Sequence, residues 1–185
     1  YQWLRLTDRY VSTTARQVGY SPFDYKRQKW FGQRNWRWRS LGLRQDMLPE
    51  LVKPGSELGK ISKKAAQQTG IPVGLPLIAS GSDKACEVLG SGCISPNIGS
   101  LSYGTTATYN VNSERYFEAS KPMPPYPAAL PNTYNAEVMI QRGYWMVSWF
   151  KKEFGQREQL LAAEQGVVPE TLFDELLHAV PPGSM

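Results

Sequence analysis

The sequence predicts an α/β fold from three observations. Strand-like and helix-like segments alternate between residues 54 and 92. Residues 98–111 have the pattern of two extended arms joined by a tight turn. The chain has 185 residues, of which 41% are apolar, so it is long enough for one ample core or two smaller ones. Alternating strands and helices are typical of α/β folds, and we expect a globular chain of this class.

The charge balance and the few metal-ligating side chains limit the expected partners. Twenty-one Lys and Arg residues against sixteen Asp and Glu give a net charge of +5. This charge favours an anionic partner, such as a phosphorylated small molecule, without establishing nucleic-acid binding. Cys86 and Cys93 lack metal-site spacing, and the single histidine, His178, cannot complete a ligand set with them. We therefore expect no metal site here, reduced thiols and a cytoplasmic protein.

The sequence shows neither the pattern of a membrane-spanning segment nor that of a secretion signal. No apolar run approaches the roughly 20 residues that cross a bilayer, and no charged leader precedes an apolar stretch. We therefore expect neither a membrane protein nor a secreted one. The chain opens on "YQWLRLTDRY" without a methionine, which suggests a piece of a longer protein.

The first fifty residues predict short elements. Residues 1–10 have the pattern of a helix end with aromatic residues and leucine, and residues 11–19 form a Ser/Thr-rich connection. The stretch "FDYKRQKW" predicts a turn, followed by a short helix over Trp30–Leu43. We expect the aromatic side of this helix to pack inward, covered by the aliphatic parts of the arginine side chains. Pro49 stops that helix, because proline removes a backbone donor and restricts the residue before it.

The same region supports a second interpretation. Between Asp24 and Asp46 there are seven basic residues, three tryptophans and no acidic residue. Tryptophans that stack bases and arginines that hold phosphates would make Lys26 to Arg44 a nucleic-acid-binding module. The inward-packed helix is the simpler explanation of the same residues, and the nucleic-acid module stays the alternative.

The middle of the chain has clear start and stop signals. A helix is expected from Ser62 to Thr69, and Gly70 supplies its C-terminal stop. A Pro/Gly turn then leads into an apolar strand over residues 75–80.

The stretch "LIASGSDKACEVLGSG" then places Asp83 between this strand and a second helix. A carboxylate at a helix start ordinarily caps the helix, which contributes about 0.5–2 kcal/mol. Open α/β sheets also bind ligands just beyond the carboxyl ends of their strands, and a general base needs only hydrogen-bond reach to a substrate hydroxyl. The local residues therefore leave Asp83 either a cap or a catalyst.

The stretch "IGSLSYGTTATYNV" predicts a tight β-hairpin with its turn at Tyr103 to Thr106. Glycine lets a phosphate approach the main chain, and a threonine hydroxyl adds a donor. A polar hairpin turn without a ligand would have the same sequence.

Taken together, these stretches resemble the central part of the FGGY carbohydrate kinases, the family of xylulokinase and glycerol kinase. Residues 48–92 resemble the family pattern "LPE…G…G…A…TGL…G.PV..GG.D…..G.G", and "SLSYGTTATYNV" is similar to the hairpin that usually reads "SLGTS". Residues 1–30, which end on a tryptophan, resemble the tyrosine-leucine helix and Ser/Thr-rich segment that precede this pattern. The resemblance implies an actin-like (ribonuclease H-like) fold with two lobes. Residues 1–95 would end lobe I, and residues 96–185 would begin lobe II.

The resemblance also implies an activity, which is the ATP-dependent phosphorylation of a sugar or polyol hydroxyl, with Mg²⁺. Asp83 would take the proton from the substrate hydroxyl, and Gly104, Thr105 and Thr106 would bind the ATP phosphates. Lys84 stands where the family often has a glutamine or asparagine that touches the substrate, so we expect it to bind substrate as well. Together with Ser82, which replaces the commoner glycine, this departure leaves the choice of sugar open.

Further expectations follow from the resemblance. The partner would be a small-molecule sugar or polyol, with no nucleic acid and no membrane, and the full-length protein would be a possible homodimer. A non-catalytic actin-like scaffold is the other alternative to a kinase. After the hairpin we expect a loop, a strand and a helix over Trp145–Phe154, with His178 exposed at a later helix end. The family's first phosphate loop and adenosine-binding segment are not in these residues, so we expect the chain alone to be inactive and prone to aggregate.

Overall fold

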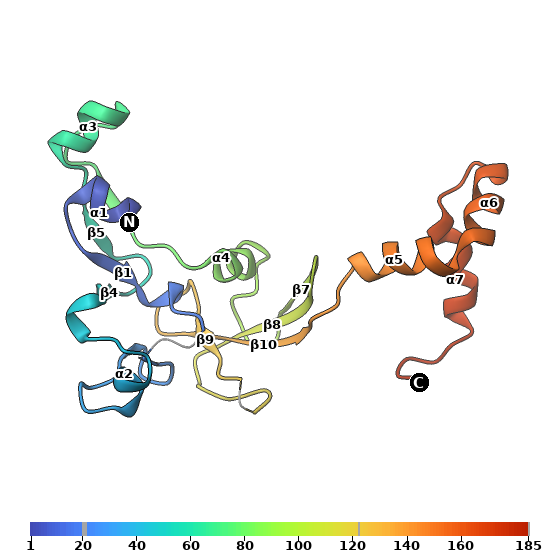
Figure 1. The fold of residues 1–185 in the computed structure, drawn as a ribbon, viewed down its shortest axis with the longest axis horizontal. Helices are drawn as coiled ribbons and strands as arrows, with labels where there is room; N and C mark the ends of the chain where they lie inside the picture. Colours follow the sequence, from blue (N-terminus) through green and yellow to red (C-terminus); the bar gives the residue numbers. More distant parts are fainter. Residues whose placement is uncertain (20–21, 122, 185) are drawn as a thin grey trace. The chain divides into compact units, whose positions relative to one another are not determined.

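A computed structural model describes residues 1–19, 22–121 and 123–184 (Figure 1). The chain divides into two compact units. Residues 1–101 and 108–138 form the first unit, and residues 102–107 and 139–185 form the second. The lobe boundary near residue 95 stays a prediction. The two compact units are defined by contacts within this chain, whereas the lobes are defined for a whole kinase.

The first unit is built on two short strand pairs beside a helix. Helix α1 covers Gln2–Thr7. Strand β1 (Val11–Thr13) pairs in parallel with β4 (Glu50–Val52), with Val11 opposite Glu50. Strand β5 (Glu57–Lys60) pairs antiparallel with β6 (Pro76–Ile78), with Glu57 opposite Ile78.

The core of these strands is apolar and small. Val11, Leu58 and Ala79 are buried together there. Trp3, Val52 and Leu77 pack against this cluster from its edge. The side chain of Trp3 thus anchors α1 to the strands, while part of its ring stays accessible.

Helix α3 (Lys63–Thr69) confirms the helix expected at this place. The Ser62 hydroxyl caps it by accepting a 3.2 Å hydrogen bond from the Ala65 N–H. Gly70 ends the helix at φ 75°, in the left-handed region that suits glycine. The apolar strand that follows is shorter than expected, because β6 covers only Pro76–Ile78.

Residues 22–48 differ from the single helix expected over Trp30–Leu43. Strands β2 (Phe23–Asp24) and β3 (Lys29–Trp30) form a small antiparallel hairpin in place of a simple turn. The helix that follows, α2, covers only Trp36–Ser40. Asn35 starts it late, since its side chain caps the Arg37 N–H at 3.0 Å.

The tryptophans of this region point in different directions. Trp38 is 4% exposed and packs inward, as expected, whereas Trp36 is 60% exposed. Gly42 follows the helix at φ 62° and turns the chain away. The extent expected for the helix was therefore wrong, and the inward packing holds for Trp38 but not for Trp36.

A four-stranded sheet follows in the order β7-β8-β10-β9. Its members are β7 (Gly99–Tyr103), β8 (Ala107–Ser113), β9 (Tyr126–Pro127) and β10 (Tyr134–Ile140). The strands β7 and β8 with their short connection confirm the predicted hairpin.

One face of β8 buries polar side chains. Thr108, Asn110 and Asn112 alternate along the strand and are all buried. The Asn112 amide donates to the Thr133 hydroxyl at 3.0 Å and lies 3.3 Å from Asn135 Oδ1. Buried polar groups are stable when they hydrogen-bond to one another, so this layer orders the sheet in place of an apolar core.

The second unit contains three consecutive helices. Helix α5 covers Trp145–Phe154, as expected, and is followed by α6 (Gln156–Gln165) and α7 (Pro169–His178). Lys151 on α5 forms a 2.6 Å ion pair with Glu170 on α7. His178 ends α7 and is exposed, which confirms the expectation of a surface residue.

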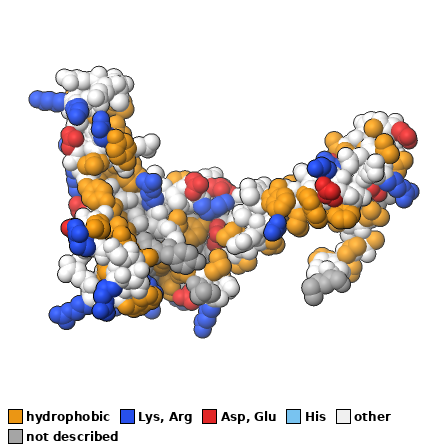
Figure 2. All heavy atoms as spheres, in the orientation of Figure 1, with side chains coloured by type: hydrophobic (Ala, Val, Ile, Leu, Met, Phe, Trp, Pro, Cys, Tyr) orange, Lys and Arg blue, Asp and Glu red, His pale blue; other side chains and the backbone are white. Residues whose placement is uncertain are grey.

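Many apolar side chains of these helices face solvent. Figure 2 shows hydrophobic side chains along the surface of α5, α6 and α7. No residue of α5 is buried, and Trp149, Phe150 and Phe154 are 46%, 47% and 65% exposed. Aromatic faces of this size are usually covered by other parts of a protein.

Candidate functional site

Helix α4 (Asp83–Gly90) begins at the candidate catalytic residue. The preceding residue, Ser82, is the cap, and its hydroxyl accepts a 3.2 Å hydrogen bond from the Ala85 N–H. Asp83 is the first helical residue, and its Oδ1 accepts only the Lys84 N–H, at 2.8 Å, among the described residues. Of the two local interpretations of Asp83, the helix-cap position therefore goes to Ser82. The Asp83 side chain is exposed and can accept further hydrogen bonds.

Close packing holds the strand end that precedes α4. A Cβ at Gly81 would lie 2.9 Å from the Ala85 Cβ and 3.3 Å from the Ala129 Cβ. Only glycine therefore allows this approach without displacing its neighbours. The next residue, Ser82, donates its backbone N–H to the Ala15 carbonyl at 2.9 Å.

The exposed carboxylate of Asp83 lines a cavity of about 700 Å³ within the first unit. This volume lies within the usual range of small-molecule sites, which is about 300–1,000 Å³. The wall comes from three segments, the start of α4, the start of α1 and the short 3₁₀ helix η1 (Thr14–Arg16) with the residues after it. Its lining residues are Tyr1, Gln2, Trp3, Arg16, Val18, Gly81, Ser82 and Asp83.

A guanidinium and an indole face each other at this cavity. The Cζ atom of Arg16 lies 5.0 Å from the centroid of the Trp3 ring, within the range of a cation–π interaction. Sequence reasoning missed both residues. Trp3 belongs to an ordinary aromatic pattern, and Arg16 lies in a polar connection, so neither position has a local signal of a site.

The neighbour of Asp83, Lys84, is turned toward the sheet. Its ammonium forms a 2.7 Å ion pair with Glu87 on the same helix and lies 3.4 Å from the Thr108 hydroxyl on β8. An ammonium has three N–H donors, so one remains beyond these two partners. Lys84 thus links α4 to the buried polar face of β8.

A tyrosine extends this polar layer. The Tyr126 hydroxyl lies 2.8 Å from Asn110 Oδ1 and 3.2 Å from Glu137 Oε2. Burial, followed by the charge of Glu137, raises the pKa of Tyr126 well above its ordinary value. The phenol therefore stays neutral and can donate a hydrogen bond within the layer that supports α4.

The hairpin turn that holds the expected ATP-binding residues belongs to the second unit. The Gly104 N–H donates to the Thr106 carbonyl at 2.9 Å, which closes the turn. The Gly143 N–H donates to the Thr105 carbonyl, also at 2.9 Å. A Cβ at Gly143 would lie 2.5 Å from the Gly104 carbonyl oxygen, so glycine is required beside this turn.

The threonine hydroxyls of this turn are available. Within the described part of the chain, those of Thr105 and Thr106 form no hydrogen bond, and the Thr105 side chain is exposed. The Gly104 amide, by contrast, serves the turn itself. Asp83 and Lys84 belong to the first unit, whereas Gly104, Thr105 and Thr106 belong to the second.

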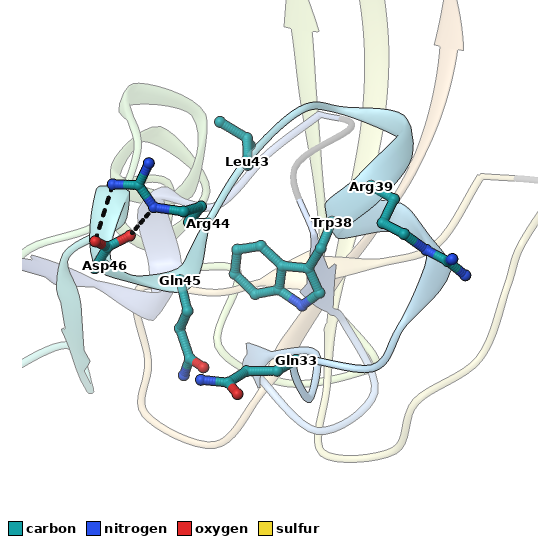
Figure 3. Close-up of a pocket in the computed structure, with 7 residues that line it drawn as sticks. All are labelled: Gln33, Trp38, Arg39, Leu43, Arg44, Gln45 and Asp46. Carbon is teal, nitrogen blue, oxygen red and sulfur yellow. Dashed lines mark hydrogen bonds and ion pairs between the residues drawn. The ribbon is translucent and has the colours of Figure 1, made fainter.

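A second cavity, of about 430 Å³, lies in the basic region (Figure 3). In Figure 3 its wall includes an ion pair in which Arg44 Nε lies 3.0 Å from Asp46 Oδ1. The other lining residues are Gln33, Trp38, Arg39, Leu43 and Gln45.

The aromatic residues around this cavity are already engaged. The Trp38 indole N–H lies 3.1 Å from the Phe31 carbonyl and 3.0 Å from that of Gly32. The Arg37 guanidinium lies over the rings of Phe31 and Trp36, at 4.6 and 4.9 Å. These residues pack on one another, which does not favour the stacking platform considered for Lys26 to Arg44.

The residues that the structure describes include no group of three or more His, Cys, Asp or Glu side chains that could hold a metal ion. None of their helices has both the length and the apolar character needed to cross a membrane.

This chain is similar in sequence and in fold to known proteins. It is 30% identical over 187 residues to uncharacterized sugar kinase YgcE of Escherichia coli (strain K12), a match that covers 97% of this chain and 36% of the relative. It is 30% identical over 155 residues to the autoinducer-2 kinase of Escherichia coli (strain ATCC 8739), covering 82% of this chain and 29% of that kinase. The crystal structure of xylulose kinase from Rhodospirillum rubrum superposes with a TM-score of 0.76 at 20% identity, covering 97% of this chain and 35% of that protein.

The sequence relatives are named as sugar kinases, and the structural neighbour has their actin-like fold. No family model matches the chain. The chain spans about a third of the length of the relatives that it matches. In sequence and in fold, the chain therefore corresponds to a segment of the FGGY carbohydrate kinase family.

Proposed function

We propose that the full-length protein containing this chain transfers a phosphoryl group from ATP to a hydroxyl of a sugar or polyol. The observation that supports this best is the exposed carboxylate of Asp83 at the wall of a ligand-sized cavity. Its helix is already capped by Ser82, so its oxygens are available for a substrate hydroxyl. The sugar-kinase relatives support the same reaction.

In this proposal Asp83 is the general base. The substrate hydroxyl donates a hydrogen bond to the carboxylate, which accepts the proton as the oxygen attacks the γ-phosphorus. The bond between the γ-phosphorus and the β–γ bridging oxygen breaks, and ADP leaves with that oxygen. A base of this kind requires hydrogen-bond reach and an ionised carboxylate. Phosphoryl transfer otherwise depends on positioning and on stabilising the phosphate charge.

The residues of the hairpin turn act on the nucleotide. The exposed Thr105 hydroxyl donates to a phosphate oxygen, and Thr106 offers a second hydroxyl. Gly104 keeps the turn narrow, and its missing side chain allows the phosphate to approach the main chain.

Lys84 takes part on the substrate side. One of its three N–H donors remains beyond Glu87 and Thr108, and it can bind a substrate hydroxyl. The same side chain holds the start of α4 against β8, which keeps Asp83 in place.

The donor nucleotide is expected to bring Mg²⁺, which would neutralise phosphate charge when bound. The described residues do not fit a complete site for it, because they contain no cluster of metal-ligating side chains. We therefore assign no step of the reaction to the metal and no residue of this chain to its coordination.

The lobe assignment completes the proposal. Residues 1–95 end lobe I and carry the substrate side, and residues 96–185 begin lobe II and carry the phosphate side. On this assignment the base and the phosphate-binding turn belong to opposite lobes, and closure of the two lobes would bring them together.

The test is an ATP-consumption assay on the full-length protein with a panel of pentuloses, hexoses, sugar acids and polyols. We expect ATP turnover that depends on at least one of these compounds, with a phosphorylated product detectable by mass spectrometry. Failure of the intact protein to phosphorylate any of them would favour the non-catalytic scaffold.

A further inference from the structure

The 3₁₀ helix η1 brings a cation to the cavity of Asp83. Its cap, Thr13, accepts the Ala15 N–H at 3.3 Å, and the Ala15 carbonyl accepts the Ser82 N–H at 2.9 Å. Arg16 follows Ala15 in the chain, and Asp83 follows Ser82, so each lies next to a residue of this second hydrogen bond. Both then line the same cavity, so a short backbone link sets the guanidinium and the carboxylate at one site.

The Arg16 guanidinium lies over the ring of Trp3. Its Cζ lies 5.0 Å from the Trp3 centroid, and Trp3 itself packs against the core of the first unit. A guanidinium over a ring can still present its N–H edge. That edge matches the two oxygens of a carboxylate or phosphate in a bidentate arrangement.

This arginine has no carboxylate partner among the residues that the structure describes. Several other arginines of the first unit do have one, including Arg9 with Glu50 at 3.3 Å and Arg44 with Asp46 at 3.0 Å. An unpaired guanidinium at the wall of a ligand-sized cavity is a recognition group for an anion.

We propose that this cavity selects a sugar or polyol that carries an anionic group, with Arg16 binding that group and Asp83 facing the hydroxyl that is phosphorylated. The inference rests on the proposed function, since it names the substrate class of the same cavity. Arg16 also offsets the repulsion between the substrate anion and the Asp83 carboxylate. Arg16 is exposed, so a neutral sugar would leave its guanidinium to water, whereas an anionic group would form charge-assisted hydrogen bonds with it and bind more tightly.

The test compares matched substrates with the full-length protein. D-gluconate and D-glucitol differ only by a carboxylate in place of a CH₂OH group, and D-xylonate and xylitol form a five-carbon pair. D-glucitol 6-phosphate supplies a phosphate as the anionic group. We expect kcat/KM for at least one of the anionic compounds to exceed that of its neutral counterpart by about 10-fold or more, the scale of one charge-assisted hydrogen bond.

Substitutions at Arg16 separate recognition from folding. Arg16→Gln should lower kcat/KM for the preferred anionic substrate by about 10–100-fold, mostly through KM, and change neutral substrates little. Arg16→Lys should recover part of the loss, because it keeps the charge without the planar fork. The control is Arg5→Gln, because Arg5 lies over the Tyr1 ring at 5.8 Å but does not line the cavity.

The outcomes separate this inference from the function on which it rests. Equal use of anionic and neutral substrates, or an equal loss for both in Arg16→Gln, overturns the inference and leaves the sugar kinase intact. If the compounds with a carboxylate are preferred to their neutral counterparts, the anionic group is a carboxylate, and if D-glucitol 6-phosphate is preferred, it is a phosphate. If no compound is phosphorylated, calorimetry measures whether the protein binds the anionic compounds. Binding that Arg16→Gln abolishes supports the anion site and contradicts the kinase function. No binding contradicts the anion site.

Discussion

The backbone N–H of Ser82 donates to the carbonyl of Ala15 at 2.9 Å. This single bond joins two segments that are far apart in the sequence, the polar connection after β1 and the strand end before α4. Its position makes the start of α4 part of the wall of a cavity. The consequences of this arrangement can be measured in the full-length protein.

Replacing Asp83 by Asn tests the general base. The amide keeps the size of the side chain but cannot accept the substrate proton, so kcat should fall by about 10²–10⁴-fold. A coupled ATP assay with the best substrate measures this change. Asp174→Asn is the matched control, because Asp174 is an exposed carboxylate on α7. Turnover near that of the wild type in Asp83→Asn would remove Asp83 from the mechanism.

Replacing Thr105 by Val tests the phosphate contact. The change removes one hydroxyl at nearly constant size, so kcat/KM for ATP should fall by about 10–100-fold, the scale of a hydrogen bond to a charged group. Sugar binding, measured by calorimetry without nucleotide, should stay unchanged. Thr171→Val on α7 is the control, since Thr171 is exposed and lies far along the chain from the turn. Unchanged ATP kinetics in Thr105→Val would argue against a phosphate-binding turn.

The cap of α4 should matter for both stability and activity. Ser82→Ala removes the hydroxyl that accepts the Ala85 N–H, at an expected cost of about 0.5–2 kcal/mol. Ser62→Ala removes the equivalent cap of α3, which has the same 3.2 Å distance. Thermal unfolding should show similar losses for the two variants. Only Ser82→Ala should also lower kcat, because only that cap positions Asp83, and equal activity in both would contradict this role.

Tyr126 should make stability depend on pH in the alkaline range. Its folded pKa lies above the ordinary value of 10.0, so the folded state binds more protons than the unfolded state once the pH exceeds 10. The stability from the neutral phenol is present below pH 10 and is lost as the pH rises from there toward the folded pKa. Urea unfolding should therefore show a falling midpoint above pH 10.

Tyr126→Phe separates this contribution from that of other tyrosines. The variant should be less stable at pH 8 by about 1–3 kcal/mol, because Asn110 and Glu137 lose their phenol partner. Its midpoint should then fall less steeply above pH 10 than that of the wild type. Tyr109→Phe serves as the control, since Tyr109 is 45% exposed. The same alkaline slope in the wild type and Tyr126→Phe would contradict the assignment.

The chain made by itself should associate. Trp149, Phe150 and Phe154 are each at least 46% exposed on α5, and apolar faces of this kind promote aggregation when uncovered. We expect strong binding of a hydrophobic dye, oligomers in size-exclusion chromatography and no sugar-dependent ATP turnover. A soluble monomer with steady turnover would contradict both the expected aggregation and the need for the rest of the kinase.

Several elements follow from local signals in the sequence. The helix over residues 63–69 is framed by Ser62 and Gly70, a capping hydroxyl and a left-handed stop. The helix over residues 145–154 has the expected bounds, and the hairpin around Gly104 follows from two extended arms at a glycine turn. These signals act between residues that are close in the chain, so they can be recognised without the fold.

Other local features were misjudged because competing signals lie close together. The basic and aromatic residues after Trp30 predicted one helix, but Asn35 and Gly42 confine it to five residues. At the start of α4, two adjacent side chains could cap the helix. The hydroxyl of Ser82 takes that position, and the carboxylate of Asp83 is left for other contacts.

The sequence by itself determined the fold class, the family resemblance and the candidate roles of Asp83 and Thr105. Only the tertiary structure decided which residues surround Asp83. Arg16 and Trp3 reach its cavity because η1 is hydrogen-bonded to the residue before α4 and α1 packs against the same core. Hydrogen bonds and packing between distant segments leave no periodic pattern in the chain, since each partner alone looks like an ordinary surface or core residue.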